Sequence, residues 1–203
     1  MISESVLNKY RATVVHLNKG KMLFQEGEAA NFFYIVKSGR VKMSNYSDDG
    51  REFVQGYFSE GQSFGEPPFF SHGPYPASAV AVDDSKVWKV SHHEFLKLLK
   101  NNFEIHLELT RILCDRLIYK STMLSELAIE EAEHRLTTLI QYLVTPVDQQ
   151  AKTHKKLIFT RQQLADMTGL RVETVIRSVK SLEKKRFLEI DKSGKIIWKR
   201  QVK

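Results

Sequence analysis

Short hydrophobic runs separated by glycines dominate the first half of the chain. Val, Phe, Tyr and Ile gather in these runs, and this composition predicts strands over residues 32–36, 40–43, 52–55 and 86–90. Asp49 and Gly50 lie between the second and third runs and predict a hairpin, because both residue types accept left-handed turn conformations. Strands at this spacing predict an antiparallel β-roll of the cupin-like kind over residues 1–100.

The hydrophobic period becomes helical after residue 91. Ser91 and Glu94 have the spacing of a capping box and predict a short helix that begins at His92 and ends near residue 100. Residues 103–127 contain no glycine or proline. They predict a helix of about 25 residues, which would be about 37 Å long.

Two apolar stripes run along this long helix. One stripe is made of leucines: Leu113, Leu117, Leu124 and Leu127. The other stripe is made of Ile105, Leu109, Ile112, Tyr119 and Met123. Two stripes predict two partners, the roll of the same chain and a second copy of the helix, so residues 101–129 are predicted to be a dimerisation helix with the leucine stripe in its interface. The alternative is one broad stripe buried within a single chain.

The last third of the chain carries the signals of a winged helix-turn-helix. A helix is predicted over residues 131–144, and Thr160 with Gln163 predicts a capping box that opens another helix. Gly169 suits the left-handed residue of a tight turn before a second helix over residues 172–184. The apolar face of this second helix is predicted to be Val175, Ile176, Val179 and Leu182. A β-hairpin over residues 187–198 would form the wing. The chain is therefore predicted to be an α+β protein, with a DNA-binding domain over residues 130–203.

Charge separates this last third from the rest. Residues 1–129 hold 15 basic and 15 acidic residues, whereas residues 130–203 hold 16 basic and 9 acidic residues. The net charge of +7 therefore lies entirely in the predicted DNA-binding domain. Such asymmetry indicates a polyanionic partner, nucleic acid or a membrane, and the alternative is a merely soluble basic surface. No apolar run approaches the roughly 18–20 residues that span a bilayer, and no signal-peptide pattern is present. We expect a cytoplasmic protein without a membrane partner.

Residue chemistry disfavours an enzyme, a metalloprotein and a disulfide-linked protein. Cys114 is the only cysteine, so an intramolecular disulfide is impossible and an iron–sulfur cluster is not expected. The pairs Asp48-Asp49 and Asp83-Asp84 fit hairpin turns, and the run His92-His93-Glu94 fits the start of a helix. We therefore expect no catalytic residues and no metal site.

The second helix of the helix-turn-helix has the chemistry of base reading. Glu173 can accept a hydrogen bond from cytosine N4, and Arg177 can bond to guanine O6 and N7. At i and i+4 the two also lie on one helix face and are expected to hold each other's rotamers, a surface ion pair being the alternative. The candidates for DNA backbone or additional contacts are Thr160, Arg161, Arg171, Val172, Thr174, Lys180 and Lys195.

The order of roll, long helix and winged helix-turn-helix resembles the Crp/Fnr family of bacterial transcription regulators over essentially the full chain. "GEAANFFYIVKSGRVKM" and "GQSFGEPPFF" look like that family's cyclic-nucleotide-binding-type roll, and "TRQQLADMTGLRVETVIRSVKSLE" looks like its DNA-binding motif. The resemblance implies homodimers that pair through the long helix, bind palindromic double-stranded DNA and contact RNA polymerase. It matches Glu173 and Arg177 to the family's base-reading residues and implies a TGA-like core. Val172 agrees with the oxygen-responsive branch, and Ile176 replaces the usual serine or glycine, so the outer bases stay open.

The resemblance also frames the effector question. In cyclic-nucleotide-binding relatives the cassette that starts with Gly-Glu ends in an arginine that meets the phosphate. Here Pro76 takes the arginine position and offers neither charge nor a backbone N–H. Cyclic nucleotide binding in the usual mode is therefore not expected. The residues that match the effector pocket are Gly65, Glu66, Ala77, Ser78, Lys120 and Ser121. For Lys120 and Ser121 the alternative is a polar pair that sets the register of the dimer.

Three alternatives for the effector stay open at this point. A non-phosphate ligand could bind the loop, or Phe69, Phe70 and Tyr75 could fill the cavity from within, so that no cofactor is needed. Haem ligated by His72 or His92 is the third. The competing function is a small-ligand module, for a cyclic nucleotide or haem, whose basic C-terminal domain is only an interaction surface.

Overall fold

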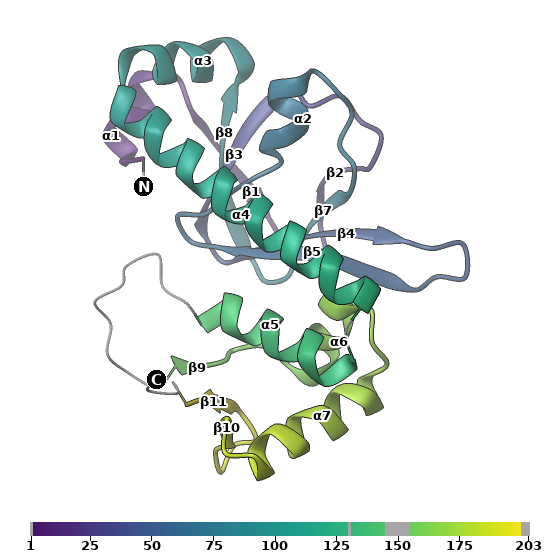
Figure 1. Ribbon diagram of the computed structural model, residues 1–203. Helices are drawn as coiled ribbons and strands as arrows, with labels where there is room; N and C mark the ends of the chain where they lie inside the picture. The colour runs from purple at the N-terminus through teal and green to yellow at the C-terminus, as the bar shows by residue number, and fades with distance from the viewer. Residues whose placement is uncertain (1, 130, 145–154, 200–203) are drawn as a thin grey trace. The chain divides into compact units, whose positions relative to one another are not determined.

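The computed structural model describes residues 2–129, 131–144 and 155–199 (Figure 1). The chain divides into two compact units, residues 1–113 and 114–203, and the long helix contributes to both. Residue 130, where the third predicted segment begins, lies outside the described residues. None of the described helices has the length and apolar character needed to cross a membrane.

Two four-stranded antiparallel sheets build the N-terminal unit, in the strand orders β1-β8-β3-β6 and β2-β7-β4-β5 (Figure 1). The four predicted strands are present as β3 (Phe32–Ser38), β4 (Arg40–Tyr46), β5 (Glu52–Ser59) and β8 (Ser85–Ser91). Four further strands were not predicted: β1 (Thr13–Leu17), β2 (Met22–Phe24), β6 (Ser63–Phe64) and β7 (Ser78–Ala81). Three of these four are only two to four residues long, so they are too short to show an alternating pattern.

Four helices accompany the sheets: α1 (Glu4–Lys9), α2 (Glu66–Ser71), α3 (His92–Asn101) and the first part of α4 (Phe103–Ile129). Ser91 caps α3 as predicted, accepting a hydrogen bond from the backbone N–H of Glu94. Helix α2 was not predicted, because Pro67 and Pro68 suggested a loop. Both prolines lie in its first turn, where the missing N–H groups would have no helical partner anyway.

Alternating side chains of β3 supply two separate hydrophobic clusters. Tyr34 and Val36 point into the interior of the roll, whereas Phe33 and Ile35 point to the other face of the sheet. On that outer face the ring of Phe33 stacks on Phe95 of α3, with centroids 3.6 Å apart. The outer cluster fastens α1, α3 and the start of α4 to the roll.

Gly39 makes the turn between β3 and β4, where the backbone packs closely against Asp84 and Ser85. Its φ is +80°, and a Cβ placed on it would lie 2.6 Å from the carbonyl oxygen of Asp84 and even closer to the Ser85 hydroxyl. We expect Gly39→Ala to lower the free energy of unfolding by about 2–4 kcal/mol, since left-handed strain and a backbone clash add together. The measurement is the urea midpoint at unchanged m-value.

Gly50 provides the matched control for that substitution. Its φ of +79° is nearly the same, but no atom lies within 4 Å of an added Cβ. Gly50→Ala should therefore cost only the backbone strain, about 1–2 kcal/mol. Equal losses for the two variants would show that the contact with Asp84 and Ser85 contributes nothing.

The described residues of the C-terminal unit form helices and a small antiparallel sheet of order β10-β11-β9. Its elements, beside the rest of α4, are α5 (Ala132–Val144), β9 (Lys155–Lys156), α6 (Arg161–Thr168), α7 (Val172–Lys184), β10 (Leu188–Ile190) and β11 (Ile196–Trp198). Val175, Val179 and Leu182 form the buried face of α7, as predicted. The prediction was wrong for Ile176, which is 39% exposed and belongs to the outer face.

The end of α4 is fixed to α5 within this unit. Tyr119 stacks on Tyr142 with ring centroids 3.6 Å apart. The buried carboxylate of Glu126 lies 2.5 Å from Nδ1 of His134 and accepts a hydrogen bond from Thr138. The N-terminal part of α4 packs instead against the outer cluster of the N-terminal unit, through Ile105, Leu109 and Leu113.

Candidate nucleic-acid interface

The helix-turn-helix begins at a complete capping box. The hydroxyl of Thr160 accepts a hydrogen bond from the backbone N–H of Gln163 at 3.1 Å, and the Gln163 side chain accepts one from the Thr160 N–H at 2.9 Å. Gly169 ends α6 with a φ of 67°, a left-handed conformation that directs the chain into α7. Leu164 and Ala165 are buried residues of α6. The predicted motif is therefore confirmed in its caps and in its turn.

The N-terminus of α7 has no side chain closing it. Arg171 is the N-cap residue, and its side chain makes no capping hydrogen bond. The first N–H groups of a helix carry a partial positive charge and attract anionic groups such as phosphates. Arg171 itself is exposed, so a guanidinium group and a helix N-terminus are presented together.

Glu173 and Arg177 both project from the outer face of α7. Each is exposed, and they are one helical turn apart. The expectation that they hold each other's rotamers was wrong, because Nη2 of Arg177 approaches the Thr174 hydroxyl at 3.5 Å and no ion pair joins it to Glu173 among the described residues. Both charged groups are consequently available to base edges. Ile176 lies between them along the helix and adds an exposed apolar group.

The other predicted contact residues differ in how accessible they are. Lys180 and Lys195 are exposed, whereas Arg161, Val172 and Thr174 are half-buried. The Thr160 hydroxyl is engaged in the capping box, although the residue is exposed.

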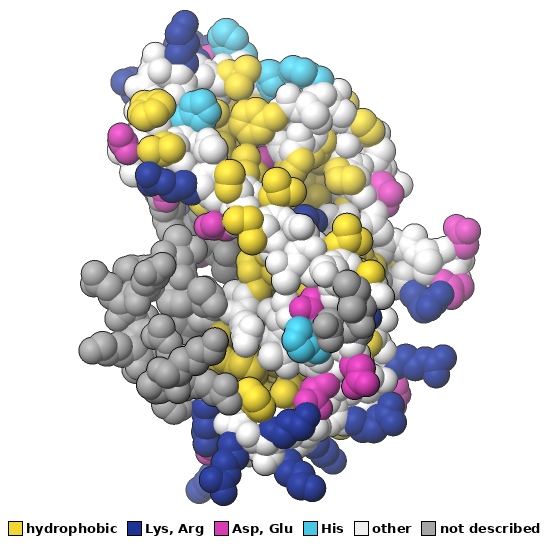
Figure 2. Space-filling view, in the orientation of Figure 1, with side chains coloured by type: hydrophobic (Ala, Val, Ile, Leu, Met, Phe, Trp, Pro, Cys, Tyr) yellow, Lys and Arg dark blue, Asp and Glu magenta, His cyan; other side chains and the backbone are white. Residues whose placement is uncertain are grey.

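The wing presents one lysine that the sequence analysis did not assign to DNA. Asp191 organises the turn between β10 and β11 by accepting hydrogen bonds from the backbone N–H groups of Ser193 and Lys195 at 2.8 and 2.9 Å. Lys192 and Lys195 are both exposed on this turn. Lysine and arginine side chains crowd the part of the unit that carries α7 and the wing (Figure 2). In the sequence Lys192 is followed by Ser193 and Gly194, and this turn signal could have placed it at the exposed tip of the wing.

The residues matched to an effector pocket are brought together only in part. Gly65 is the N-cap residue of α2, which begins at Glu66, and Ala77 directly precedes β7, which begins at Ser78. Glu66, Ala77 and Ser78 are all buried. The Ser78 hydroxyl already accepts a hydrogen bond from the backbone N–H of Glu26 at 3.0 Å. Lys120 and Ser121 are exposed on the part of α4 that belongs to the C-terminal unit.

Aromatic rings occupy the roll interior beside this segment. The Tyr75 ring stacks on Phe24 with centroids 3.7 Å apart, and its hydroxyl donates to the carbonyl oxygen of Phe32 at 3.3 Å. A Cβ on Gly65 would lie 3.1 Å from the Tyr75 ring, so glycine is needed for this close approach. Burial raises the pKa of Tyr34, a neighbour in the same cluster, to about 12.

The three aromatic residues expected to fill the cavity behave differently from one another. Only Tyr75 enters the roll interior. Phe69 is fully buried in the outer cluster instead, against Phe33 and Phe95, and Phe70 is 37% exposed. That expectation was therefore wrong for two of the three, because α2 turns their side chains away from the interior. At the position of the missing arginine, the carbonyl oxygen of Pro76 accepts a hydrogen bond from the Asn45 side chain at 2.6 Å.

Three members of the predicted leucine stripe remain uncovered on α4. Leu117, Leu124 and Leu127 are 68%, 69% and 50% exposed. Leu113 differs, because it is half-buried against the outer cluster of the N-terminal unit. The second stripe packs within the chain, as the burial of Leu109 and Met123 shows.

Comparisons with known proteins match both units. The model of the cyclic nucleotide-binding domain matches residues 14–102, and that of the Crp-like helix-turn-helix domain matches residues 134–200. The cAMP-activated global transcriptional regulator CRP of Haemophilus influenzae is 31% identical to this chain, over 84% of the chain and 79% of the relative. The cyclic AMP receptor protein of Thermus thermophilus is 28% identical, over 81% and 74%.

Solved structures share the same fold. FixK2 from Bradyrhizobium japonicum superposes with a TM-score of 0.73 at 22% identity, covering 93% of each chain. A variant of CooA from Carboxydothermus hydrogenoformans gives a TM-score of 0.77 at 20% identity, covering 98% of this chain and 88% of the other. The roll, the long helix and the winged helix-turn-helix therefore occur together in both.

Proposed function

This chain belongs to the Crp/Fnr family of DNA-binding transcription regulators, and we propose that it acts as a homodimer on palindromic DNA without needing a cyclic nucleotide. In this proposal residues 1–100 are a sensor-type roll, residues 101–129 the dimerisation helix and residues 130–203 the DNA-reading domain. RNA polymerase is its further partner, on the strength of the family resemblance, and the cytoplasm is its place of action. No catalytic step is part of the proposal.

The observation that carries this function is the outer face of α7. Glu173 and Arg177 are exposed one turn apart, and neither is consumed by an ion pair with the other. A glutamate that accepts from cytosine N4 and an arginine that donates to guanine O6 and N7 can read neighbouring base pairs in the major groove. The open N-terminus of α7 and the exposed lysines of the wing supply phosphate contacts that position the helix.

The uncovered leucine stripe supports the homodimer. Leu117, Leu124 and Leu127 present apolar surface on a helix whose other stripe already packs within the chain. A two-fold axis along α4 would place the same stripe of both copies in one interface. Two reading helices related by this axis would bind half-sites one helical turn apart, which requires a palindromic target.

Two features of the roll support the proposed independence from a cyclic nucleotide. Pro76 cannot donate a hydrogen bond to a phosphate, and its carbonyl oxygen is already bonded to Asn45. The stacked rings of Tyr75 and Phe24 occupy space beside Gly65. The two curated relatives compared above are named as cAMP-activated or cyclic AMP receptor proteins. In this chain Pro76 takes the position that the resemblance assigns to a phosphate-binding arginine.

Selection from random duplexes tests the proposed function. The full chain, purified without added nucleotide, should enrich a palindrome with a TGA-like half-site core at modest salt. Failure to enrich any sequence, with and without cyclic AMP, would favour the competing function, in which the basic C-terminal unit is only an interaction surface.

A thermal-shift titration checks the nucleotide separately. A ligand that binds only the folded state at 100 times its Kd stabilises it by about 2.7 kcal/mol, which gives a clear rise in Tm. We expect no rise with cyclic AMP or cyclic GMP, because the phosphate has no cationic partner at Pro76. The Haemophilus influenzae relative, assayed in parallel, is the positive control. A saturable rise for this chain would contradict the account of the roll.

A further inference from the structure

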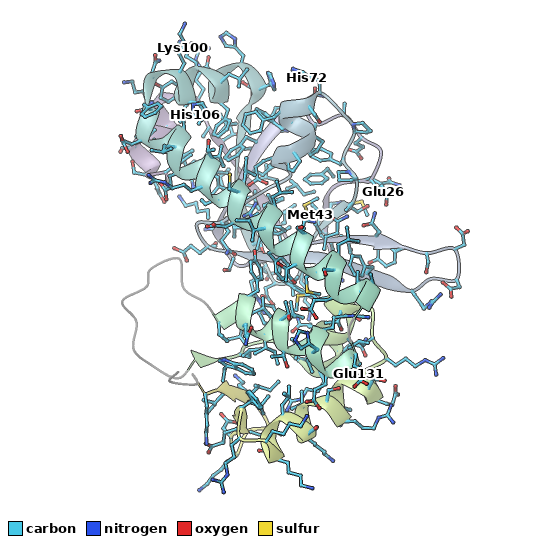
Figure 3. All side chains as sticks on the ribbon, viewed as in Figure 1. Glu26, Met43, His72, Lys100, His106 and Glu131 are labelled. Atoms are coloured by element: carbon cyan, nitrogen blue, oxygen red, sulfur yellow. The ribbon has the colours of Figure 1, made fainter. Side chains whose placement is uncertain are left out.

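Two histidine side chains meet at the surface of the N-terminal unit, among residues to which the proposed function gives no role. His72 is the C-cap residue of α2, and His92 is the first residue of α3. Their ring centroids are 5.1 Å apart and their planes are inclined by 47°. Together with Asn31, Gly73 and neighbouring backbone, they line a hollow of about 500 Å³. Figure 3 labels His72 where it projects from the end of α2.

Backbone hydrogen bonds fix the position of both histidines. The N–H of His92 donates to the carbonyl oxygen of Asn31 at 3.1 Å. His72 adopts a left-handed conformation with a φ of 57°, and the N–H groups of His72 and Gly73 both reach the carbonyl oxygen of Pro68. Histidine is one of the few residues besides glycine enriched in this conformation. The two rings therefore project from anchored ends of two helices.

The imidazole nitrogens are not used in the fold. Over residues 2–129, 131–144 and 155–199, no hydrogen bond or ion pair reaches a ring nitrogen of His72 or His92. The ring of His92 is held instead by Phe69, with centroids 4.5 Å apart. His92 is half-buried and packs on Phe69, whereas His72 is exposed, so the pair is accessible to solvent.

The ring separation matches two ligands of one small metal ion. A metal–nitrogen distance of about 2.0–2.1 Å at a tetrahedral angle places two imidazole centroids about 5 Å apart. Ligation from opposite faces of a haem would need about 6 Å with the porphyrin between the rings, so the pair does not suit that arrangement. Imidazole prefers zinc, copper, nickel and iron over magnesium or calcium.

We propose that His72 and His92 form a two-histidine site for a divalent transition-metal ion of the zinc and nickel class. The sequence analysis expected no metal site, and the proposal departs from that expectation. Among the described residues no group of three or more His, Cys, Asp or Glu completes the coordination. The remaining positions on the ion face the hollow and are open to water or to a small ligand, as in sites whose ion keeps an exchangeable position.

Metal titration of the untagged full chain tests the site. Calorimetry with Zn²⁺ should give saturable binding of one ion at this site per protomer, and Co²⁺ should give the visible absorption bands of a nitrogen-ligated ion. His72→Asn and His92→Gln should each weaken this binding by about ten-fold or more, since even outer-shell changes cost about 10–100-fold. Asparagine also accepts the left-handed backbone of residue 72, so folding is preserved.

His93 provides the matched control. It is the exposed neighbour of His92 on α3 and does not line the hollow. His93→Gln should leave the affinity unchanged, and equal urea midpoints for all variants show that the fold is intact. The proposal fails if the parent chain shows no saturable binding, if His72→Asn and His92→Gln bind as tightly as the parent, or if His93→Gln weakens binding as much as they do.

Discussion

Replacing Arg177 by alanine is expected to abolish preference for one guanine in each half-site, at a cost of about 1–3 kcal/mol, or roughly 5- to 150-fold. The side chain is exposed on the outer face of α7, and within the described parts of the chain its one polar contact is a long approach to the Thr174 hydroxyl at 3.5 Å. The fold therefore does not depend on it, and the loss should be confined to recognition. Competition binding with duplexes substituted at each position measures the effect.

Lys195 on the wing distinguishes base reading from charge. Lys195→Ala removes an exposed cation without touching α7. It should weaken binding to all duplexes alike and reduce the salt dependence by about one phosphate contact. If Arg177→Ala also weakened all duplexes alike, Arg177 would be a phosphate contact and the assignment of base reading would be wrong.

The double substitution Leu117→Glu and Leu124→Glu is expected to separate the dimer. Full burial of a leucine side chain contributes about 1.5–3 kcal/mol, and a two-fold interface would bury both leucines of each copy. Removing this surface and bringing carboxylates together should weaken dimerisation by more than about 100-fold. Analytical ultracentrifugation measures the association, and binding to the palindrome should fall with it.

A double substitution elsewhere controls for added charge. Met22 and Leu96 are 44% and 41% exposed and lie on β2 and α3, outside the stripe. Met22→Glu with Leu96→Glu should leave the dimer intact. A dimer that survives Leu117→Glu with Leu124→Glu would show that α4 pairs through another surface or that the chain does not pair through α4.

Local signals were sufficient for the helix-turn-helix. The capping box at Thr160 and Gln163 and the left-handed Gly169 are decided by neighbouring residues, so the sequence predicted their geometry correctly. The burial of Val175, Val179 and Leu182 follows from helical period alone. Ile176 was misplaced because apolar character suggested burial, whereas its position on α7 turns it outward.

Side-chain direction in the segment from Phe64 to Ala81 could not be predicted in the same way. Helix α2 was not predicted because Pro67 and Pro68 suggested a loop. Without that helix, the sequence did not indicate that Phe69 packs in the outer cluster while Tyr75 packs in the interior of the roll. The neighbours that hold these rings, Phe95 and Phe24, are far away in the sequence. The predicted contact between Glu173 and Arg177 is absent for a different reason: both side chains are exposed, and Arg177 approaches the hydroxyl of Thr174 on the same helix instead.

Fluorescence anisotropy with the nucleotide-free full chain measures whether the protein recognises a DNA sequence without an effector. The duplexes are the palindrome obtained by selection and a scrambled duplex of equal composition, each titrated at two salt concentrations. The account predicts a preference of about 10³-fold or more for the palindrome, retained at the higher salt and unchanged by cyclic AMP. Equal affinity for both duplexes, or a preference that develops only when cyclic AMP is added, would contradict it.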